Sequence, residues 1–484
     1  MIAKIIVDNK SKQVDKPFDY LVPKELEGKI KIGSRVLVPF SSGNREIEGF
    51  CVGTADTSGS KRLKSIIRTA NDTVGFDEDM LELIEWMHKK YLASYLDIIH
   101  TIVPSGTALK TKEWIILENK SEEKSEIRRR IAEILTDNGG SMEFKALKEM
   151  CGVDIQNQVR AMIKEGTLKK EYRQSVDIKD KKIKCVKLIC DRETALESAE
   201  ILRRKAPVQA KMLEVLSENE YVSLADLQKF TNGSHSTVKA LEKKNLVNVF
   251  DMTVERDPYW NRVFEKTEKM VPTPEQEYAI DEITNSVKSG DGGIYLLHGV
   301  TGSGKTEVFM QTIENVINMG KSAIMLVPEI SLTPQMVSRF MSRFGGRVAI
   351  FHSGLSAGER YDQWKKIRDG EADIVIGARS AIFTPLKNIG VIIMDEEHSD
   401  TYKSDMSPRY HARETAIFRA SQFGAAVVLA SATPSVESYY KAQTGEYKLL
   451  EMNTRYNKNK MPEISVIDMR SELEKGNKSM LSGK

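Results

Sequence analysis

The chain has 484 residues, of which 72 are lysine or arginine and 69 are aspartate or glutamate, so its net charge is only +3. This balance excludes a uniformly basic nucleic-acid-binding protein, and the length predicts about three domains. The four cysteines, Cys51, Cys151, Cys185 and Cys190, form no CxxC pair, which argues against a zinc site and disulfides in this chain. Because no signal peptide or membrane-length apolar run occurs, we expect a cytoplasmic protein with no membrane partner.

Residues 1–105 predict a small β-rich domain, with a pattern of short strands and turns that is typical of a barrel or a sandwich. Short apolar strands at 5–7, 35–38 and 49–52 are separated by polar turn clusters. Apolar residues at helical spacing follow from residue 77 to 99 and predict a helix that closes this domain.

Residues 122–250 predict a winged-helix region in one or two copies. Three short helices followed by a strand are expected at 131–168 and again at 212–246, which is the order of a winged helix-turn-helix. The third helix of each unit is basic. Such units also serve as docking modules and spacers, so DNA contact and scaffolding both stay open.

After a proline-containing hinge at 252–274, residues 258–455 alternate between apolar strands and helices. This alternation predicts a parallel sheet covered by helices on both faces, which is a RecA-like P-loop lobe. The whole chain is therefore expected to be a multi-domain α/β protein.

The letters GVTGSGKT at 299–306 follow an apolar strand and open a helix. In this context backbone N–H groups point at phosphate oxygens, Lys305 reaches the β and γ phosphates, and the Thr306 hydroxyl ligates Mg²⁺. The alternative is a glycine-rich turn before an ordinary helix, which the complete pattern disfavours. The predicted nucleotide-binding residues of this loop are Gly299, Val300, Thr301, Gly302, Ser303, Gly304, Lys305 and Thr306.

The apolar strand at 391–394 ends in the letters DEEH at 395–398. Carboxylates at the end of a buried parallel strand lie at the same sheet edge as the phosphate loop. We expect Asp395 to hold Mg²⁺ together with Thr306, and Glu396 to polarise the attacking water. Lys305, Asp395 and Glu396 are thus the predicted catalytic residues.

Further motifs distinguish a helicase from a kinase, a GTPase or a transporter. They are PEISLTPQ at 328–335, GARSAIF at 377–383 and SATPS at 431–435, and together they resemble those of superfamily 2 nucleic-acid helicases. With the tripeptide Phe-Asp-Tyr at 18–20, the resemblance narrows to the PriA family of replication-restart helicases and spans nearly the whole chain.

The resemblance implies a pocket for the 3′ end of a nascent DNA strand, made by Phe18, Asp19, Tyr20 and Lys64. A ring would stack on the terminal base, Asp19 would accept from the 3′-hydroxyl, and Lys64 would neutralise phosphate. Ser41 stands where the family often has glycine. As a lone tripeptide, Phe-Asp-Tyr would be a plain strand edge.

Gln276 resembles the glutamine by which such helicases read the adenine edge, which would favour ATP. From the residues alone, Thr273 and Pro274 also predict the first turn of a helix, and both interpretations can hold.

The resemblance also implies a track for single-stranded DNA. Arg379 would face its phosphates, which predicts salt-sensitive binding. The segment 401–411 resembles the family's aromatic-rich loop, in which bases would stack on Tyr402 or Tyr410 near Arg409. Packing of both tyrosines in the core is the alternative.

His398 is expected to couple DNA binding to hydrolysis by a hydrogen bond toward the segment of Ser431 and Thr433. An ordinary histidine satisfied by its neighbours is the alternative.

The family function implied is ATP-driven 3′-to-5′ unwinding at stalled forks and loading of the replicative helicase, with ATP and Mg²⁺ as cofactors. The implied partners are forked and single-stranded DNA, primosome proteins, single-stranded-DNA-binding protein and the helicase loader, met at forks in the nucleoid. The alternatives are a non-enzymatic DNA-end-binding fragment and a superfamily 2 DNA translocase of a repair or restriction system.

Residues 456–484 resemble the lead-in to a second lobe, and the sequence holds neither that lobe's arginine motif nor the family's zinc-binding cysteine clusters. We therefore expect an N-terminal portion that binds DNA and ATP but unwinds poorly, with zinc only in the part of the family that this sequence lacks.

Overall fold

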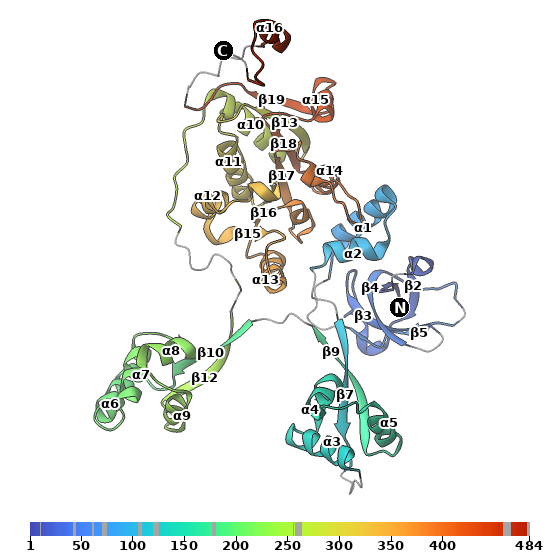
Figure 1. Ribbon diagram of the computed structural model, residues 1–484, viewed down its shortest axis with the longest axis vertical. Coiled ribbons are helices and arrows are strands. Elements are labelled where there is room, and N and C mark those ends of the chain that lie inside the picture. Colours follow the sequence, from blue (N-terminus) through green and yellow to red (C-terminus); the bar gives the residue numbers. More distant parts are fainter. Residues whose placement is uncertain are drawn as a thin grey trace.

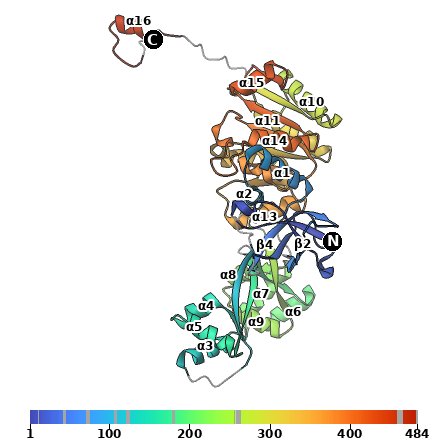
Figure 2. The ribbon, with the colours of Figure 1, turned by 90° about the vertical axis from the view of Figure 1, so that its right-hand side faces the viewer.

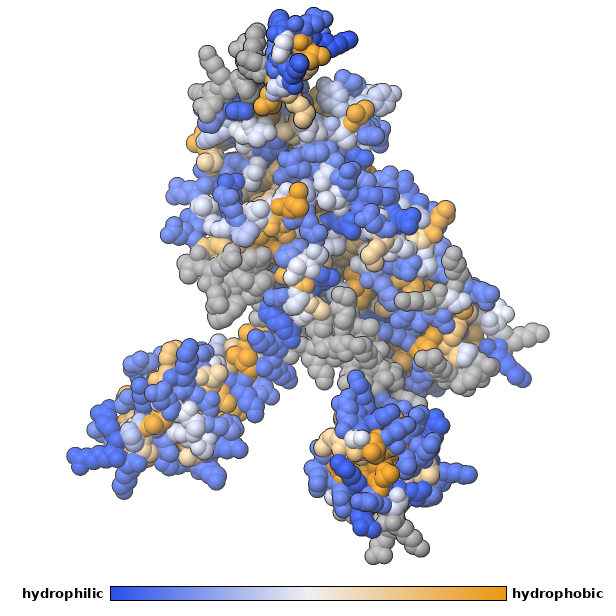
Figure 3. All heavy atoms as spheres, in the orientation of Figure 1, coloured by the Kyte–Doolittle hydropathy of each residue, from blue (hydrophilic) through white to orange (hydrophobic). Residues whose placement is uncertain are grey.

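The computed structural model describes residues 1–9, 11–41, 45–60, 62–69, 75–104, 109–119, 125–176, 181–254, 256, 264–457 and 466–481. These residues form four sheets. Figure 1 shows the N-terminal module beside a larger α/β lobe, with two smaller units below them. On the face drawn in Figure 3 the surface is mostly hydrophilic, with scattered apolar side chains. No helix of the described ranges is long and apolar enough to cross a membrane.

The N-terminal sheet has six strands in the order β5-β2-β1-β4-β3-β6. The consecutive strands β5 and β6 pair with opposite edges of this sheet, so it curls on itself around apolar residues such as Ile5, Val36 and Cys51. The predicted β-rich domain is confirmed. The strands are β1 (Ile2–Val7), β2 (Phe18–Leu21), β3 (Arg35–Phe40), β4 (Arg45–Ala55), β5 (Lys64–Ser65) and β6 (Arg68–Thr69).

The single helix predicted over 77–99 is wrong, because two helices occupy this stretch: α1 (Glu78–Tyr91) and α2 (Tyr95–Ile102). Leu92 between them has φ 51° and is 90% exposed, and the side chain of Ser94 caps α2 by accepting from the Asp97 N–H. A left-handed residue followed by a serine N-cap ends one helix and starts another, even where the apolar spacing continues.

The two small units each contain the predicted helices and final strand, together with further strands and, in the second unit, a further helix, α6, outside the predicted pattern. Each has its own three-stranded sheet and its own apolar core. The first unit contains β7 (Leu109–Leu117), α3 (Glu126–Asp137), β8 (Ser141–Glu143), α4 (Phe144–Cys151), α5 (Gln156–Lys164) and β9 (Leu168–Val176). The second contains β10 (Lys181–Leu188), α6 (Arg192–Leu202), α7 (Pro207–Ser217), β11 (Val222–Ser223), α8 (Leu224–Thr231), α9 (His235–Lys243) and β12 (Val247–Val254).

The large lobe is built on a seven-stranded parallel sheet in the order β15-β16-β14-β17-β18-β13-β19. This confirms the predicted RecA-like lobe and adds β19, which the sequence did not reveal. The strands are β13 (Gly293–Gly299), β14 (Ser322–Leu326), β15 (Val348–Phe351), β16 (Ile374–Gly377), β17 (Ile389–Asp395), β18 (Ala426–Ser431) and β19 (Lys448–Met452).

Helices cover both faces of this sheet, as continuously apolar parallel strands require. One face packs against α10 (Pro274–Ser289), α11 (Lys305–Asn318) and α12 (Pro334–Phe344). The other packs against α13 (Ala357–Arg368), α14 (Ala412–Ser421) and α15 (Val436–Gln443).

The N-terminal helices share the core of this second face. Met80, Leu83 and Ile99 belong to the same buried cluster as Phe383 and Ala416 of the lobe. Helices α1 and α14 lie side by side in the views of Figures 1 and 2. The N-terminal module and the lobe are therefore packed as one body, although the two small units separate them in the sequence.

Parts of the predicted hinge and of the predicted lead-in to a second lobe, residues 257–263 and 458–465, fall outside the described ranges. The lead-in contains α16 (Met469–Glu474). The short 3₁₀ helices are η1 (Lys12–Val14), η2 (Lys24–Leu26), η3 (Glu329–Ser331), η4 (Gly345–Arg347), η5 (Arg379–Phe383) and η6 (Asp400–Tyr402).

Candidate functional site

The phosphate loop connects β13 to α11. Gly302 and Gly304 have φ values of 82° and 87°, which side chains rarely adopt, and this lets the loop curl over the start of the helix. The Lys305 Nζ donates to the Gly299 carbonyl at 2.7 Å. The loop forms one wall of a cavity of about 560 Å³, and every residue from Val300 to Thr306 lines it.

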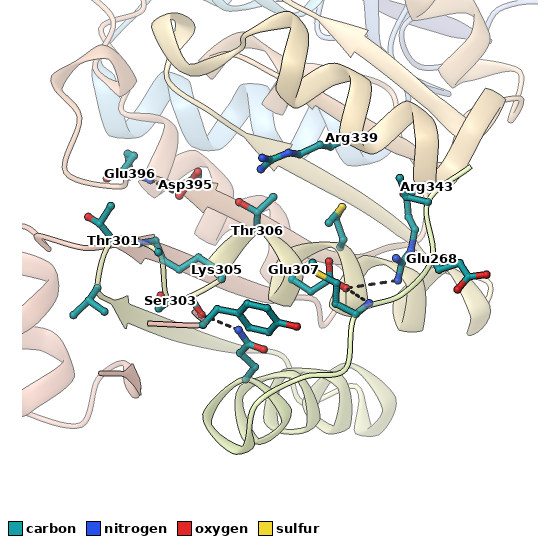
Figure 4. A pocket seen from close by; sticks show the side chains of 18 residues that line it. Glu268, Thr301, Ser303, Lys305, Thr306, Glu307, Arg339, Arg343, Asp395 and Glu396 are labelled. Atoms are coloured by element: carbon teal, nitrogen blue, oxygen red, sulfur yellow. Dashed lines mark hydrogen bonds and ion pairs between the residues drawn. The ribbon is translucent and has the colours of Figure 1, made fainter. Parts of the chain in front are cut away.

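The structure brings Lys305, Thr306, Asp395 and Glu396 to this one cavity, as Figure 4 shows. Asp395 is the last residue of β17, so it stands at the carboxyl edge of the sheet where β13 also ends. Burial and the neighbouring Glu396 raise the pKa of the Asp395 carboxyl to about 6, and Lys305 partly opposes this. An acidic oxygen cluster beside a threonine hydroxyl is the kind of donor set that Mg²⁺ prefers, so these residues fit the predicted metal.

Gln276 lies in the same wall, 1% exposed. Its Oε1 accepts from the Thr273 N–H in a capping box at the start of α10, and its Nε2 donates to the Ser303 carbonyl at 2.7 Å. The predicted helix start is therefore present. In this conformation both the oxygen and the nitrogen of the Gln276 amide are bonded to the protein backbone, and the bond to Ser303 stabilises the phosphate loop.

Residues that the sequence did not point to also line this cavity, among them Arg339, Arg343 and Tyr456. Arg343 is bonded to Glu314 at 3.0 Å, whereas Arg339, one turn earlier on α12, points into the cavity above Thr306 (Figure 4). The i, i+4 spacing of the two arginines was visible in the sequence. Tyr456 is held over the loop by a hydrogen bond from its N–H to the Gly302 carbonyl at 2.9 Å.

A second cavity, of about 680 Å³, lies at the same edge of the sheet. Arg379 lines it and donates to the main-chain carbonyls of Thr401 and Lys403, which are neutral and leave its positive charge in place. Arg360 also lines it and donates to the Ser353 carbonyl at 3.3 Å. The α2 residue Thr101 belongs to its wall, so the N-terminal module and the lobe build this groove together.

The segment 401–411 borders this second cavity, but both of its tyrosine rings are in the core. Tyr402 is 0% and Tyr410 3% exposed. The Tyr402 hydroxyl donates to the Asp395 carbonyl at 2.6 Å, and Tyr410 packs edge-on against Phe383. Core packing, the alternative left open by the sequence, is what the structure shows, and neither ring face is open to a base. Arg409 is exposed, as is Met406, at 76%.

The Phe18-Asp19-Tyr20 tripeptide forms β2, and its three side chains differ in exposure. Phe18 and Asp19 are half-buried, whereas Tyr20 is in the core, 4% exposed, where burial raises its pKa to about 12. Asp19 accepts from the Ser58 hydroxyl, and Lys64, paired with Tyr20 in the sheet, donates to the Ser41 carbonyl at 2.6 Å.

Ser41 has φ 63°, in the region that favours glycine. The side chains of Phe18, Asp19 and Lys64 are thus accessible to a ligand at the β5–β2 edge of the N-terminal sheet, whereas the side chain of Tyr20 is buried.

His398, Ser431 and Thr433 are in contact. The His398 Nδ1 lies 2.8 Å from the Ser431 hydroxyl, and the Thr433 N–H donates to the same hydroxyl at 2.9 Å. Glu396, next to this group, has φ 46°, a left-handed conformation that costs a non-glycine residue roughly 1–2 kcal/mol. Its neighbours must hold it there.

His411 makes the start of α14 sensitive to pH. Its Nδ1 accepts from the Arg413 N–H at 3.2 Å, which requires a neutral ring. Burial, aided by Arg413, lowers its pKa below the ordinary 6.5. As pH falls below 6.5 the unfolded chain takes up this proton first, so the stability contributed by neutral His411 is lost.

We expect His411→Asn, whose amide oxygen caps without titrating, to flatten the acid side of the stability profile between about pH 7.5 and about pH 5.5. Thermal melting across that range measures it, with exposed His235→Asn as control. A variant as acid-sensitive as the wild type would contradict this role of His411.

Fold and site together define the first lobe of a DEAD/DEAH-type helicase. The family model for DEAD/DEAH box helicases matches residues 273–442, and the model for the PriA 3′ DNA-binding domain matches residues 4–104. The replication restart protein PriA of Bacillus subtilis (strain 168) is 40% identical over 99% of this chain and 59% of its own length. PriA of Synechocystis sp. (strain ATCC 27184 / PCC 6803 / Kazusa) is 32% identical over 99% of this chain and 58% of its own length.

The chain belongs to the PriA family of replication restart proteins, and it spans a little over half the length of these relatives. A solved structure of RecG bound to a three-way DNA junction is 26% identical over 40% of this chain and 24% of that chain, with a TM-score of 0.30.

Proposed function

We propose that this chain forms the nucleotide- and DNA-binding part of an ATP-driven, 3′-to-5′ replication-restart helicase that recognises stalled forks. The observation that carries this proposal is the convergence of Lys305, Thr306, Asp395 and Glu396 on one cavity. A second groove lies beside it, lined by cations and carboxylates alike: Arg360, Arg379, Lys403, Glu329, Asp400 and Asp405. Family membership supports it, since the relatives are named for replication restart.

In this proposal the loop N–H groups and Lys305 bind the triphosphate. Thr306 and Asp395 hold Mg²⁺, which neutralises charge on the phosphates when bound. Glu396 orients the attacking water and accepts its proton, so that the γ-phosphoryl group passes to water rather than to a protein side chain. Arg339 adds a positive charge to the cavity near Thr306. Gln276 stabilises the conformation of the phosphate loop through its bond to the Ser303 carbonyl.

The second groove is the proposed track for single-stranded DNA. Arg379 and Arg409 contact phosphates, which makes binding salt-dependent and independent of sequence. Phe18, Asp19 and Lys64 recognise a free 3′ end, with Phe18 supplying the stacking ring because Tyr20 is buried. His398, Ser431 and Thr433 link the water-activating turn to the neighbouring strand. Primosome proteins, single-stranded-DNA-binding protein and a helicase loader are the proposed protein partners.

Replacing Glu396 by glutamine separates binding from chemistry. We expect Glu396→Gln to bind Mg·ATP within about twofold of the wild type and to slow single-turnover phosphate release with single-stranded DNA roughly 100-fold or more, because the proton acceptor is lost. Nucleotide titrations and phosphate assays on the whole chain measure both quantities. Unchanged phosphate release in the variant would refute the role of Glu396.

A fork with a free leading-strand 3′-hydroxyl and the same fork carrying a 3′-phosphate test end recognition. The free end should bind more tightly, and Asp19→Asn should reduce the difference. Equal affinities for the two forks would refute recognition of the 3′ end. They would favour the alternative that the chain is part of a DNA translocase of a repair or restriction system. Nucleotide binding without any phosphate release would favour the non-enzymatic alternative.

A further inference from the structure

The first turn of α14 carries two neighbouring side chains that contact different parts of the molecule. Arg413 points to the turn that contains Glu396 and Glu397, and Glu414 points to α1 of the N-terminal module. One short helical turn therefore touches both Glu397, the residue after the proposed hydrolytic residue Glu396, and the module that carries the proposed DNA-end pocket.

On the inner side, the Glu397 carboxylate is completely buried. It accepts from the Arg413 guanidinium at 3.0 Å, from the Ser435 N–H at 2.6 Å and from the Ser438 hydroxyl at 2.9 Å. Arg413 also donates to the Ser435 and Ser438 hydroxyls. A buried carboxylate with this many donors is fixed in place, because removing any one leaves charge or polar groups unpaired.

The anchored Glu397 directly follows Glu396, and its backbone is bonded to the sheet as well. Asp395 before it is paired with Ala430 in the sheet, and the Glu397 N–H after it donates to the Ala430 carbonyl at 3.0 Å. Both neighbours are thus bonded to one residue of β18, and Glu396 between them has a left-handed conformation, φ 46°. Release of Glu397 would let the turn relax and move the Glu396 carboxylate.

On the outer side, α14 is held by the last turn of α1. The Tyr91 hydroxyl donates to Glu414 at 3.0 Å and accepts from the His411 N–H at 3.4 Å. Lys90 lies 3.6 Å from the same carboxylate. One turn further along α14, Phe418 stacks on Trp86 with ring centroids 4.6 Å apart.

We propose that the first turn of α14 is a positioning joint: Arg413 and Glu397 hold Glu396 in its working conformation, and Tyr91 ties that joint to the N-terminal module. The inference rests on the proposed function and adds its regulation. A DNA end bound by the N-terminal module and a nucleotide bound by the lobe then change each other's affinity, and by the same factor in both directions.

The inner half is tested by Glu397→Gln, which keeps the shape of the side chain and removes its charge. Single-turnover phosphate release should slow about tenfold or more while the affinity for Mg·ATP stays within about threefold, since a positioning residue acts on the transition state. Arg413→Lys should slow release less, because it keeps the charge without the forked donors. The matched control is Glu446→Gln, which breaks the exposed Lys441–Glu446 pair on the same lobe.

The outer half is tested by Tyr91→Phe, which removes only the bridging hydroxyl and keeps the ring. The affinity of the whole chain for Mg·ATPγS is measured with and without a saturating single-stranded oligonucleotide with a free 3′ end. We expect a ratio of about five or more in the wild type and below about two in Tyr91→Phe. The exposed Tyr440→Phe should keep the wild-type ratio.

Each outcome has a distinct meaning. A wild-type ratio of one, or a Tyr91→Phe ratio equal to the wild type, overturns the joint even though both ligands bind. Normal phosphate release by Glu397→Gln overturns the positioning of Glu396. Failure of the wild type to bind Mg·ATPγS at all refutes the proposed function itself. Thermal melting of each variant shows whether a loss of phosphate release or coupling comes from unfolding. If Glu397→Gln is unfolded, the rate of phosphate release by Arg413→Lys, compared with that of the Glu446→Gln control, tests the positioning of Glu396 instead.

Discussion

Replacing Arg419 by alanine is expected to destabilise the lobe by about 3–5 kcal/mol, the range for leaving buried charged or polar groups unpaired. Arg419 on α14 is 2% exposed, and its guanidinium donates to the carbonyls of Ile382, Thr384 and Leu386. It thereby links the segment 382–386, which follows β16, to α14. Its burial lowers its pKa to about 10, and Asp77 and Asp79 oppose this, so it stays charged at neutral pH.

Alanine would leave those three carbonyls without their donor and open a cavity beneath α1. Urea unfolding followed by tryptophan fluorescence measures the loss, with Arg203→Ala as control. Arg203 makes exposed ion pairs with Glu200 and Glu214, so its removal should change the stability much less than removal of Arg419. A loss of similar size for both variants would show that the clamp on the three carbonyls contributes little.

Replacing Lys305 by alanine is expected to weaken binding of Mg·ATP roughly 100-fold, about 3 kcal/mol, with little effect on stability. In the structure the Lys305 amine donates a hydrogen bond to the Gly299 carbonyl at the start of the phosphate loop. A phosphate would replace that neutral carbonyl by a charged acceptor, and such hydrogen bonds are stronger.

Isothermal titration of Lys305→Ala with ATP and ADP measures this loss, and Lys321→Ala is the matched control. Lys321 also donates to a backbone carbonyl, that of Val287, in the same lobe but away from the cavity. If Lys305→Ala bound nucleotide as tightly as Lys321→Ala, the loop would not be a phosphate site.

The residues that the sequence placed together correctly are those whose positions follow from local rules. A glycine loop must join a strand to a helix, and a carboxylate that ends a parallel strand must reach the same edge of the sheet, so Lys305 and Asp395 could be expected to meet. The same logic gave the parallel lobe, because its apolar strands alternate with helices.

Contacts between distant segments could not be predicted in this way. Tyr402 and Tyr410 look exposed in a polar loop, yet they are buried because the loop packs against Phe383 and the end of β17. Tyr91 bonds to a residue 323 positions away, which no local pattern reveals. Helix spacing also continued through Leu92, where the backbone turns left-handed.

The core shared by α1, α2 and the lobe has a consequence for biosynthesis. Tyr91 leaves the ribosome 323 residues before its partner Glu414, a delay of roughly 15–65 s at bacterial elongation rates of about 5–20 residues per second. Throughout that interval α1 and α2 can pack only on each other and on the N-terminal sheet, and the lobe residues of their shared core have not yet been made. The core of the N-terminal helices is therefore completed only after α14 has been synthesised.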